Sequence, residues 1–314
     1  MTIDDIRTAA GRVDGHVLRT PLLTAPWGDP DRPLWVKPES LQPIGAFKVR
    51  GAFNAMGALE ATGVDRTAGV VAYSSGNHAQ AVAYAAARYA LPAHIVMPEE
   101  TPAVKVEATR RHGARVVLCA AGRREAVAAQ VADETGAVMI PPFDHPDIIA
   151  GQGTIGLEIA ADLPDVRAVF IPVSGGGLAS GIGTAIKALC PQAAVIGVEP
   201  ELAADTAEGL AQGRRVDWPI ERRNRTIADG LRSQPSALTF AHLRRVLDDV
   251  VTVSEAEIRA GMRELAFRAR LVAEPSGAVA LAGYRKLAGP PGPAVVILSG
   301  GNVDPALLSQ ILAE

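Results

Sequence analysis

The sequence predicts an α/β fold built from open, twisted, mostly parallel sheets. Short apolar runs rich in β-branched residues alternate along the 314 residues with alanine-rich segments of helical periodicity. Strands that are apolar throughout are typical of parallel sheets covered by helices on both faces. A hydrophobic content of 48% over this length suffices for about two domains, or for one large domain with an inserted lobe.

Eight strands follow from the apolar runs, in chain order. They are expected over 34–37, 69–73, 93–97, 114–118, 169–173, 195–198, 250–253 and 294–298. Helical periodicity follows the second and the fifth of these strands, over 77–89 and 177–189. Residues 201–236 have weaker periodicity and several Arg, Pro and Gly residues, so we expect this stretch to be rich in loops.

Capping signals place the ends of two further helices. Thr101 followed by Pro102 predicts an N-cap and a first-turn proline, and Gly113 predicts the end of the same helix. Ser254, with Glu257 three residues later, predicts a capping box that opens a second helix.

The composition excludes several classes of protein. A net charge of −3 provides no basic field for nucleic acid, and no apolar run is long enough to span a bilayer. The amino terminus lacks the basic and then apolar layout of a signal peptide. Cys119 and Cys190 lie far apart in apolar surroundings, which argues against a disulfide framework and fits a reducing compartment. We therefore expect a cytoplasmic protein with no nucleic-acid or membrane partner.

Lys48 is the first candidate for chemistry. It lies in the segment GAFKVRGA over 45–52, where small neighbours can pack a lysine tightly and partly remove it from water. Desolvation favours the neutral amine, which can form a Schiff base or act as a base. A single lysine is far more often a solvated surface charge, so this interpretation depends on three further segments.

A glycine-rich turn after a predicted strand is a candidate anion site. Residues 174–178 read Ser-Gly-Gly-Gly-Leu and open a predicted helix. Glycines allow close approach of the backbone, and free amides at a helix start bind anions such as phosphate. A tight strand–helix turn is the simpler alternative. A non-catalytic nucleotide-binding module is another, since Glu199 ends the next strand, but Ser180 occupies the third glycine position of a dinucleotide fingerprint.

Two more segments place polar residues at strand ends. Ser-Ser-Gly-Asn-His over 74–78 leads into a helix, and its amides and hydroxyls can bind a carboxylate. Ser299 follows the last predicted strand, at the edge where open α/β sheets bind ligands. An N-cap cluster and a simple turn are the ordinary alternatives. Together with Lys48 and the glycine turn, these segments suit pyridoxal phosphate, which needs a lysine, a phosphate anchor and a partner for its ring nitrogen.

At these segments the chain resembles the fold type II pyridoxal-phosphate enzymes, specifically the serine/threonine dehydratase (ammonia-lyase) family that includes serine racemase. The resemblance runs from about Thr20 to Asp304. It rests on the motifs FKVRGA (47–52), SSGNHAQ (74–80), AGQGT (150–154), SGGG (174–177), TIADG (226–230), EPSGA (274–278) and SGGN (299–302). It implies two lobes with the cofactor between them: a large domain of residues 1–67 and 148–314, and a small inserted domain of residues 68–147. It also implies a homodimer.

The resemblance implies roles for individual residues. The cofactor-binding residues would be Phe47, Lys48, Asn77, Ser174, Gly175, Gly176, Gly177, Leu178, Glu274 and Ser299. Among them, Lys48 would form the Schiff base, the amides of residues 175–178 would bind the phosphate and Ser299 would hold the ring nitrogen. The residues that bind the substrate would be Ser74, Ser75, Gly76, Asn77, His78 and Arg124. For Arg124, a solvated arginine on a helix is the alternative.

A metal site is implied as well. Glu199, the carbonyl of Ala203 and Asp205 match the family pattern for Mg²⁺ or Ca²⁺, and hard oxygen ligands suit either ion. The alternative is a pair of acidic residues on a solvated loop.

The implied activity is elimination of water from L-serine or L-threonine, giving a 2-oxo acid and ammonia, with Lys48 as the base for the α-proton. A serine or amino-acid racemase is the strongest alternative, because the resemblance places Ser75 where serine racemases have a second acid/base on the opposite face of the intermediate. A 3-hydroxyaspartate dehydratase is a further one and would use an added basic group for the side-chain carboxylate.

Three residues depart from the common family pattern. Ile44, Ala46 and Ser174 stand where threonine, serine and glycine are frequent. None of them removes a required group, but the altered turn before Lys48 can shift substrate preference. The sequence stops soon after Asp304, so we expect no regulatory carboxy-terminal domain and no feedback control by isoleucine.

Overall fold

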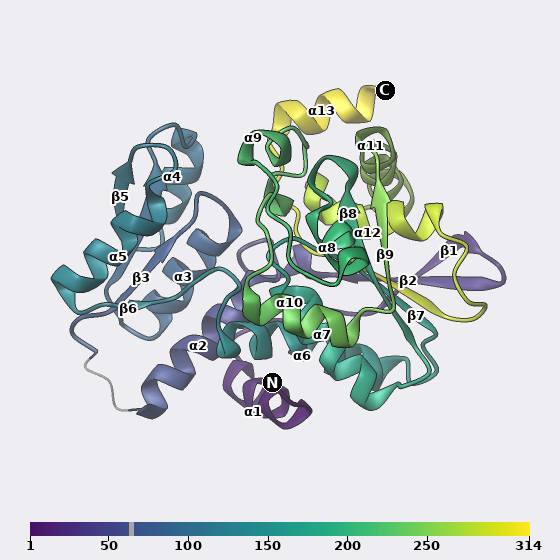
Figure 1. Cartoon of the computed structure of the whole chain (residues 1–314), viewed down its shortest axis with the longest axis horizontal. Helices are drawn as coiled ribbons and strands as arrows, with labels where there is room; N and C mark the ends of the chain where they lie inside the picture. Colours follow the sequence, from purple (N-terminus) through teal and green to yellow (C-terminus); the bar gives the residue numbers. More distant parts are fainter. Residues whose placement is uncertain (63–65) are drawn as a thin grey trace.

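The computed structural model describes residues 1–62 and 66–314 and contains two sheets (Figure 1). In the first sheet the strand order is β1 (Leu23–Asp29), β2 (Arg32–Pro38), β10 (Ala294–Leu298), β7 (Ala168–Pro172), β8 (Ala194–Pro200) and β9 (Asp249–Val253). In the second sheet it is β5 (Arg115–Cys119), β4 (Ala93–Pro98), β3 (Val70–Tyr73) and β6 (Val138–Met139). The β1–β2 pair is antiparallel and the other described strand pairs are parallel.

Helices cover both sheets. They are α1 (Ile3–Val13), α2 (Lys48–Thr62), α3 (Asn77–Arg88), α4 (Ala103–Arg110), α5 (Arg124–Thr135), α6 (Pro146–Asp162), α7 (Gly177–Leu189), α8 (Asp205–Gln212), α9 (Ile220–Arg223), α10 (Ala237–Val246), α11 (Glu255–Glu264), α12 (Pro275–Lys286) and α13 (Pro305–Ala313). Short 3-10 turns are η1 (Glu39–Leu41), η2 (Glu201–Ala203) and η3 (Asp229–Leu231), and η4 (Leu265–Ala269) is a π-helical turn. None of the described helices is long and apolar enough to cross a membrane.

The predicted fold class and all eight predicted strands are confirmed, with ends that differ by at most a few residues. The capping box of Ser254 and Glu257 is also present. The prediction for Thr101 was wrong: Pro102 is the N-cap of α4, and the hydroxyl of Thr101 is buried without a hydrogen-bond partner among the described residues. Residues 201–236 form two short helices and two 3-10 turns joined by loops.

Each face of the first sheet has its own hydrophobic core. On one face, alternate strand residues such as Phe170 and Val198 pack with α11 and α12. On the other face, Val169 and Val195 pack with α6, α7 and α10. A separate core lies under the second sheet and includes Phe53 of α2 together with the alanines of α3. Helix α2 therefore lies between the two sheets and contacts both α3 and α6.

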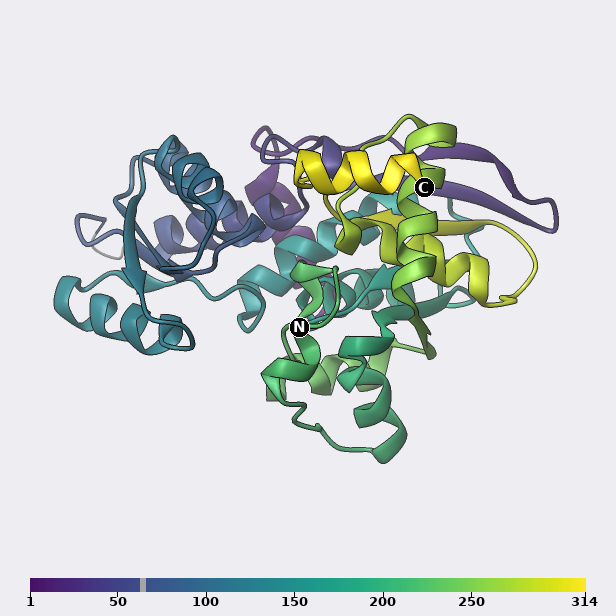
Figure 2. The ribbon, with the colours of Figure 1, turned by 90° about the horizontal axis from the view of Figure 1, so that it is seen from above.

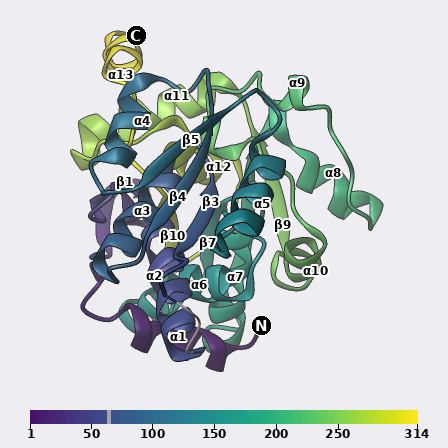
Figure 3. The ribbon, with the colours of Figure 1, turned by 90° about the vertical axis from the view of Figure 1, so that its left-hand side faces the viewer.

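The second sheet, with α3, α4 and α5, lies to one side of the first sheet (Figure 2). All its strands fall between Val70 and Met139, so the chain leaves the first sheet after α2 and returns to it through α6. At the return, α2, α6 and α7 lie side by side (Figure 3).

Candidate active site

A cavity of about 580 Å³ is lined by residues that follow strands of both sheets. It brings together every residue that was predicted to bind cofactor or substrate: Phe47, Lys48, Ser74, Ser75, Gly76, Asn77, His78, Arg124, Ser174, Gly175, Gly176, Gly177, Leu178, Glu274 and Ser299. These residues come from segments spread over most of the chain. The proposed metal ligands Glu199, Ala203 and Asp205 are not part of this wall.

Lys48 is the first residue of α2, and its amine faces the cavity wall. Its Nζ donates a hydrogen bond of 2.6 Å to the carbonyl oxygen of Pro142 and lies 5.2 Å from the centre of the Phe47 ring. Burial lowers the pKa of Lys48 to about 8, because an ammonium ion loses hydration there. An appreciable fraction of the amine is therefore neutral near neutral pH, as nucleophilic attack on an aldehyde requires.

The glycine-rich turn leads from β7 into α7. A Cβ atom on Gly175 would lie 2.2 Å from the ring of Phe143, and Gly176 has a φ of +87°, so both positions require glycine. The first amides of α7 have no partner inside the helix, and they can bind an anion. The hydroxyl of Ser174 donates to the carbonyl of Ser233 and accepts from its N–H, each at 3.0 Å.

Asn77, at the start of α3, is held by two neighbours. Its Nδ2 donates to Oε1 of Glu274 at 2.8 Å, and its Oδ1 accepts from Nδ2 of Asn302 at 2.8 Å. Gly45, with a φ of +72°, makes room for Asn302, because a Cβ atom there would lie 2.5 Å from Oδ1 of Asn302. Burial raises the pKa of Glu274 to about 8. Sequence reasoning gave no role to Asn302, although it ends the SGGN motif.

Three other predicted residues have distinct surroundings. Ser75 is half-buried in the cavity wall. Nε2 of His78 lies 2.9 Å from the carbonyl oxygen of Ile140, and burial, followed by the charge of Lys48, lowers the pKa of His78 to about 3. His78 is therefore neutral at ordinary pH. Ser299 is 4% exposed, and its hydroxyl donates to the carbonyl of Ser276 at 3.5 Å.

Two cations line the cavity on the side of the second sheet. Arg124 begins α5, is half-buried and forms no ion pair with any described acid. Lys105 of α4 forms an ion pair of 3.0 Å with Asp229 of η3, and both residues belong to the cavity wall. Sequence reasoning missed this pair, because its members are far apart in the chain and each resembles an ordinary surface charge.

The proposed metal ligands lie where β8 meets α8. Both carboxylate oxygens of Glu199 accept backbone N–H groups, from Thr206 at 3.1 Å and from Ala207 at 2.8 Å. Burial and the charge of Asp205 raise the pKa of Glu199 to about 8, and burial raises the pKa of Asp205 to about 7. Oδ2 of Asp205 is buried and has no hydrogen-bond partner in the part of the chain that the structure describes. A divalent cation would satisfy this oxygen and offset the repulsion, although no described group of three or more His, Cys, Asp or Glu residues could hold a metal.

The cavity fits pyridoxal phosphate. It supplies an amine with a lowered pKa, a turn where side chains are excluded and amides are free, and a buried hydroxyl at a strand end. These groups would serve as the partner of the aldehyde, the binding site of the phosphate and a neutral partner of the ring nitrogen.

Comparisons with known proteins agree with this fit. The model of the family described as "Pyridoxal-phosphate dependent enzyme" matches residues 13–300. An L-threonine ammonia-lyase from Geobacter sulfurreducens is 42% identical over 285 residues, which cover 89% of this chain and 70% of that protein. An L-threo-3-hydroxyaspartate ammonia-lyase from Saccharomyces cerevisiae is 41% identical over 313 residues, which cover 96% and 94% of the two chains.

A solved structure shows the same architecture. Maize serine racemase matches with a TM-score of 0.93 and 38% identity, over 99% of this chain and 97% of that chain. The chain therefore belongs to the pyridoxal-phosphate-dependent enzyme family, and its fold is that of the fold type II members.

Proposed function

We propose that the protein is an ammonia-lyase that eliminates water from L-serine or L-threonine to give a 2-oxo acid and ammonia. The observation that carries the proposal is the Lys48 amine, whose pKa is lowered to about 8, in a cavity that also contains the glycine turn and Ser299. The two ammonia-lyases described above, each about 40% identical to this chain, support the reaction class.

The residues present would hold the cofactor at four points. The amides of residues 175–178 would bind its phosphate, Lys48 its aldehyde carbon and Ser299 its ring nitrogen, while Asn77 has a second N–H left for the ring oxygen. When bound, the cofactor withdraws electrons from an attached amino acid and so makes its α-proton removable. Ser299 offers a hydroxyl rather than a carboxylate, so it would not keep the ring nitrogen protonated, and the weaker electron sink would favour prompt loss of the β-hydroxyl.

The remaining steps belong to the protein. The amides and hydroxyls of residues 74–78, at the start of α3, would bind the α-carboxylate together with Arg124. Lys48, once free and neutral, would remove the α-proton. His78 is neutral and hydrogen-bonded to Ile140, so it would position this loop rather than carry a proton.

Racemisation is the second candidate. Ser75 lines the cavity that contains Lys48, so a hydroxyl is available as a second acid/base, and maize serine racemase shares the fold at a TM-score of 0.93. Elimination from 3-hydroxyaspartate is supported by Arg124, which has no acidic partner among residues 1–62 and 66–314, and by the yeast relative. A second carboxylate on the substrate would pair with such a cation.

A substrate panel tests the proposal. L-serine, L-threonine and L-threo-3-hydroxyaspartate are incubated with the holoenzyme, and 2-oxo acid, ammonia and the D-isomer of the remaining amino acid are measured. We expect stoichiometric 2-oxo acid and ammonia from serine or threonine, and loss of at least about 10³-fold of the activity in Lys48→Ala. Full activity in Lys48→Ala would contradict the assignment. Formation of D-serine that is lost in Ser75→Ala would establish the racemase.

Further features are proposed with the activity. Glu199, the Ala203 carbonyl and Asp205 would bind Mg²⁺ or Ca²⁺, since an unpartnered carboxylate oxygen is buried there.

Residues 68–147 would act as a small domain inserted in a large domain of residues 1–67 and 148–314, since the second sheet lies within them. A homodimer and a cytoplasmic location complete the proposal, and the two buried, unpaired cysteines fit the reducing conditions of such a location.

A further inference from the structure

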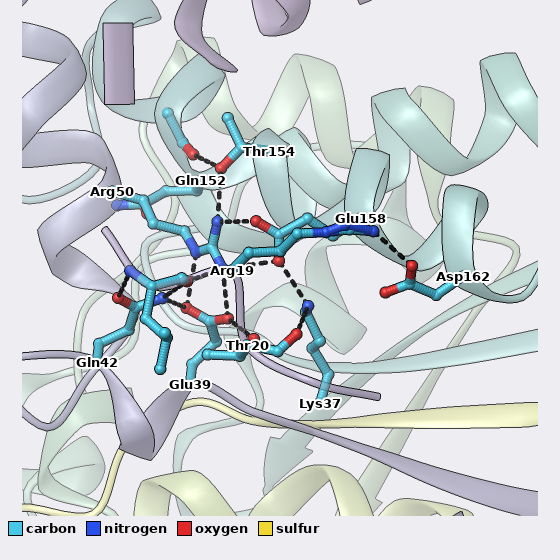
Figure 4. Close-up of polar contacts among 12 residues, drawn as sticks. Arg19, Thr20, Lys37, Glu39, Gln42, Arg50, Gln152, Thr154, Glu158 and Asp162 are labelled. Carbon is cyan, nitrogen blue, oxygen red and sulfur yellow. Dashed lines mark hydrogen bonds and ion pairs between the residues drawn. The ribbon is translucent and has the colours of Figure 1, made fainter. Parts of the chain in front are cut away.

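A cluster of four charged side chains is buried between β2, η1, α2 and α6 (Figure 4). It contains two cations, Lys37 and Arg50, and two carboxylates, Glu39 and Glu158. The side chains of Lys37, Glu39 and Arg50 are 0% exposed and that of Glu158 is 15% exposed. Removing charges from water is costly, so this cluster calls for an explanation beyond packing.

Arg50 is the centre of the cluster. Its Nε and Nη2 donate to the two oxygens of Glu39 at 2.7 and 2.8 Å, and its Nη1 and Nη2 donate to the two oxygens of Glu158 at 2.6 and 2.9 Å. Nη1 also donates to the hydroxyl of Thr154 at 3.1 Å. Because the guanidinium is planar, two bidentate pairs fix both its position and its plane.

The position of Arg50 links this cluster to the reactive amine. Arg50 lies two residues after Lys48, in the first turn of α2. Thr154 and Glu158 belong to α6, and Pro142, which accepts the hydrogen bond from Lys48, lies just before α6 begins. The first turn of α2 is thus tied to the same segment at two places, by Lys48 at the cavity wall and by Arg50 in the buried cluster.

Between these two ties the helix backbones are in close contact. A Cβ atom on Gly151 of α6 would lie 2.6 Å from Cα of Gly51, and the N–H of Gly51 donates to Oε1 of Gln152 at 3.3 Å. This contact sets the distance between the two helices. The rotation of α2 about its own axis must be fixed by side chains. The side chain of Arg50 does this by binding Glu39 of η1 and Glu158 of α6 at the same time.

We propose that Arg50 is a positioning residue for Lys48. By binding Glu39 and Glu158 together, Arg50 fixes the orientation of the first turn of α2 and so holds the Lys48 amine at the carbonyl of Pro142. Apolar residues of similar volume commonly stabilise a protein as well as a buried ion pair does, so stability alone does not explain these charges. Their specific contribution is the orientation of the first turn of α2. The inference rests on the proposed role of Lys48.

The test compares Arg50→Lys with Lys37→Met. An ammonium group keeps the charge of Arg50 but cannot form two bidentate pairs. Lys37 is equally buried and donates to the same Glu158, but it belongs to β2 and its described hydrogen bonds go to Thr20 and Glu158 rather than to α2, so Lys37→Met is the matched control. For each protein we would measure the thermal unfolding midpoint, kcat and KM, and the pH dependence of borohydride trapping of pyridoxal phosphate on Lys48, located by peptide mass spectrometry.

Both variants are expected to lower the unfolding midpoint. Only Arg50→Lys is expected to shift the trapping profile toward higher pH, as Lys48 gains water, and to lower kcat by about 10- to 100-fold with KM changed little. A folded Arg50→Lys protein with the wild-type trapping profile would show that the positioning role is wrong. Equal shifts of the trapping profile in both variants would also contradict it, since the effect would then belong to the cluster as a whole and not to Arg50.

Two further measurements distinguish a failure of this inference from a failure of the proposed function. A wild-type protein that is not labelled at Lys48 would contradict the proposed function and not the role of Arg50. If Arg50→Lys does not fold, Thr154→Val removes only one of the hydrogen bonds of Arg50. We expect a smaller shift of the trapping profile in the same direction, and an unshifted profile in folded Thr154→Val would overturn the inference.

Discussion

At the scale of single residues, the buried carboxyl group of Glu274 in the cavity wall lowers the stability of the folded protein when it is ionised. It is the N-cap of α12, is 6% exposed and accepts a hydrogen bond from Asn77. Burial, followed by the charge of Asp229, raises the pKa of Glu274 from 4.5 to about 8, and the bond from Asn77 opposes this only in part. Around neutral pH the folded protein therefore retains a proton that the unfolded chain has released.

This predicts a loss of stability with rising pH. The stabilisation linked to the proton on Glu274 is complete below about pH 4.5 and is lost as the pH rises through about 8. In Glu274→Gln the side chain is neutral at every pH, so the free energy of unfolding of the apoprotein should fall less between about pH 5 and about pH 8 than in the wild type. Urea unfolding at the two pH values measures this difference. Glu107→Gln, at an exposed position of α4, is the control, and an equal effect there would contradict the role of Glu274.

Residues that belong to a local motif were predictable, and residues whose partners are distant were not. The glycines of residues 175–177 lie between a strand and a helix, so their place in the cavity wall could be predicted from the sequence. Arg50 looked like an ordinary charge beside Lys48, because nothing in the local sequence shows that Glu39 and Glu158 meet around it. Capping by Thr101 was wrong because the neighbouring Pro102 takes the N-cap position itself.

At the scale of elements, the α2–α6 contact determines where the reactive amine lies. Gly51 and Gly151 let the two helices approach at the level of the first turn of α2. A Cβ atom on Gly151 would lie 2.6 Å from Cα of Gly51 and 2.7 Å from the carbonyl oxygen of Arg50, and neither backbone atom can move without its helix.

Gly151→Ala is therefore expected to destabilise the protein by about 1–3 kcal/mol, the usual result of overpacking. Urea unfolding measures the change. Gly11→Ala on α1 is the matched control, because no atom lies within 4 Å of the Cβ position there. In a helix, this change should stabilise the protein by about 0.5–1 kcal/mol. Equal free energies of unfolding for wild type and Gly151→Ala would show that the helices can separate freely.

Elements with a clear apolar run were predicted and those without one were missed. Strand β1 contains Pro26 and Gly28, pairs antiparallel with β2 and has a register shift, so its sequence shows no strand signal. Strand β6 has two residues, too few for any periodicity. Both strands form because a neighbouring strand provides backbone N–H and C=O groups for hydrogen bonding. This pairing depends on the tertiary structure and not on the local sequence.

At the scale of the whole molecule, a metal ion at the proposed site would act on stability rather than on the chemistry of the cavity. Glu199 and Asp205 join β8 to α8 and do not line the cavity. Without a cation the two carboxyl groups are buried close to each other with raised pKa values, which disfavours the folded state at neutral pH. A cation that binds only the folded protein would reverse this effect.

We therefore expect chelation to act on unfolding and not on substrate binding. Removal of Mg²⁺ or Ca²⁺ should lower the free energy of unfolding by about 1–3 kcal/mol, while KM stays within about twofold. Calorimetry with and without chelator, followed by metal replacement, provides the measurement. Asp205→Asn should abolish the response to metal. An unfolding midpoint that does not change on chelation in the wild type would contradict the site.

The cavity wall also has a consequence for the time course of folding. In the chain, Lys48 comes before the strands of the second sheet, Gly175 comes after them, and Ser299 follows β10, the last described strand. Groups that meet in one cavity are therefore separated by most of the chain. Contacts over such separations require long loops to close and are formed slowly. Lys48 lies on α2, whereas Ser74 and Asn77 follow β3 of the second sheet, so the cavity forms only when both parts have folded. Capture of the cofactor on a nascent or refolding chain should therefore be among the last events, and its absorbance would report completed assembly of both sheets.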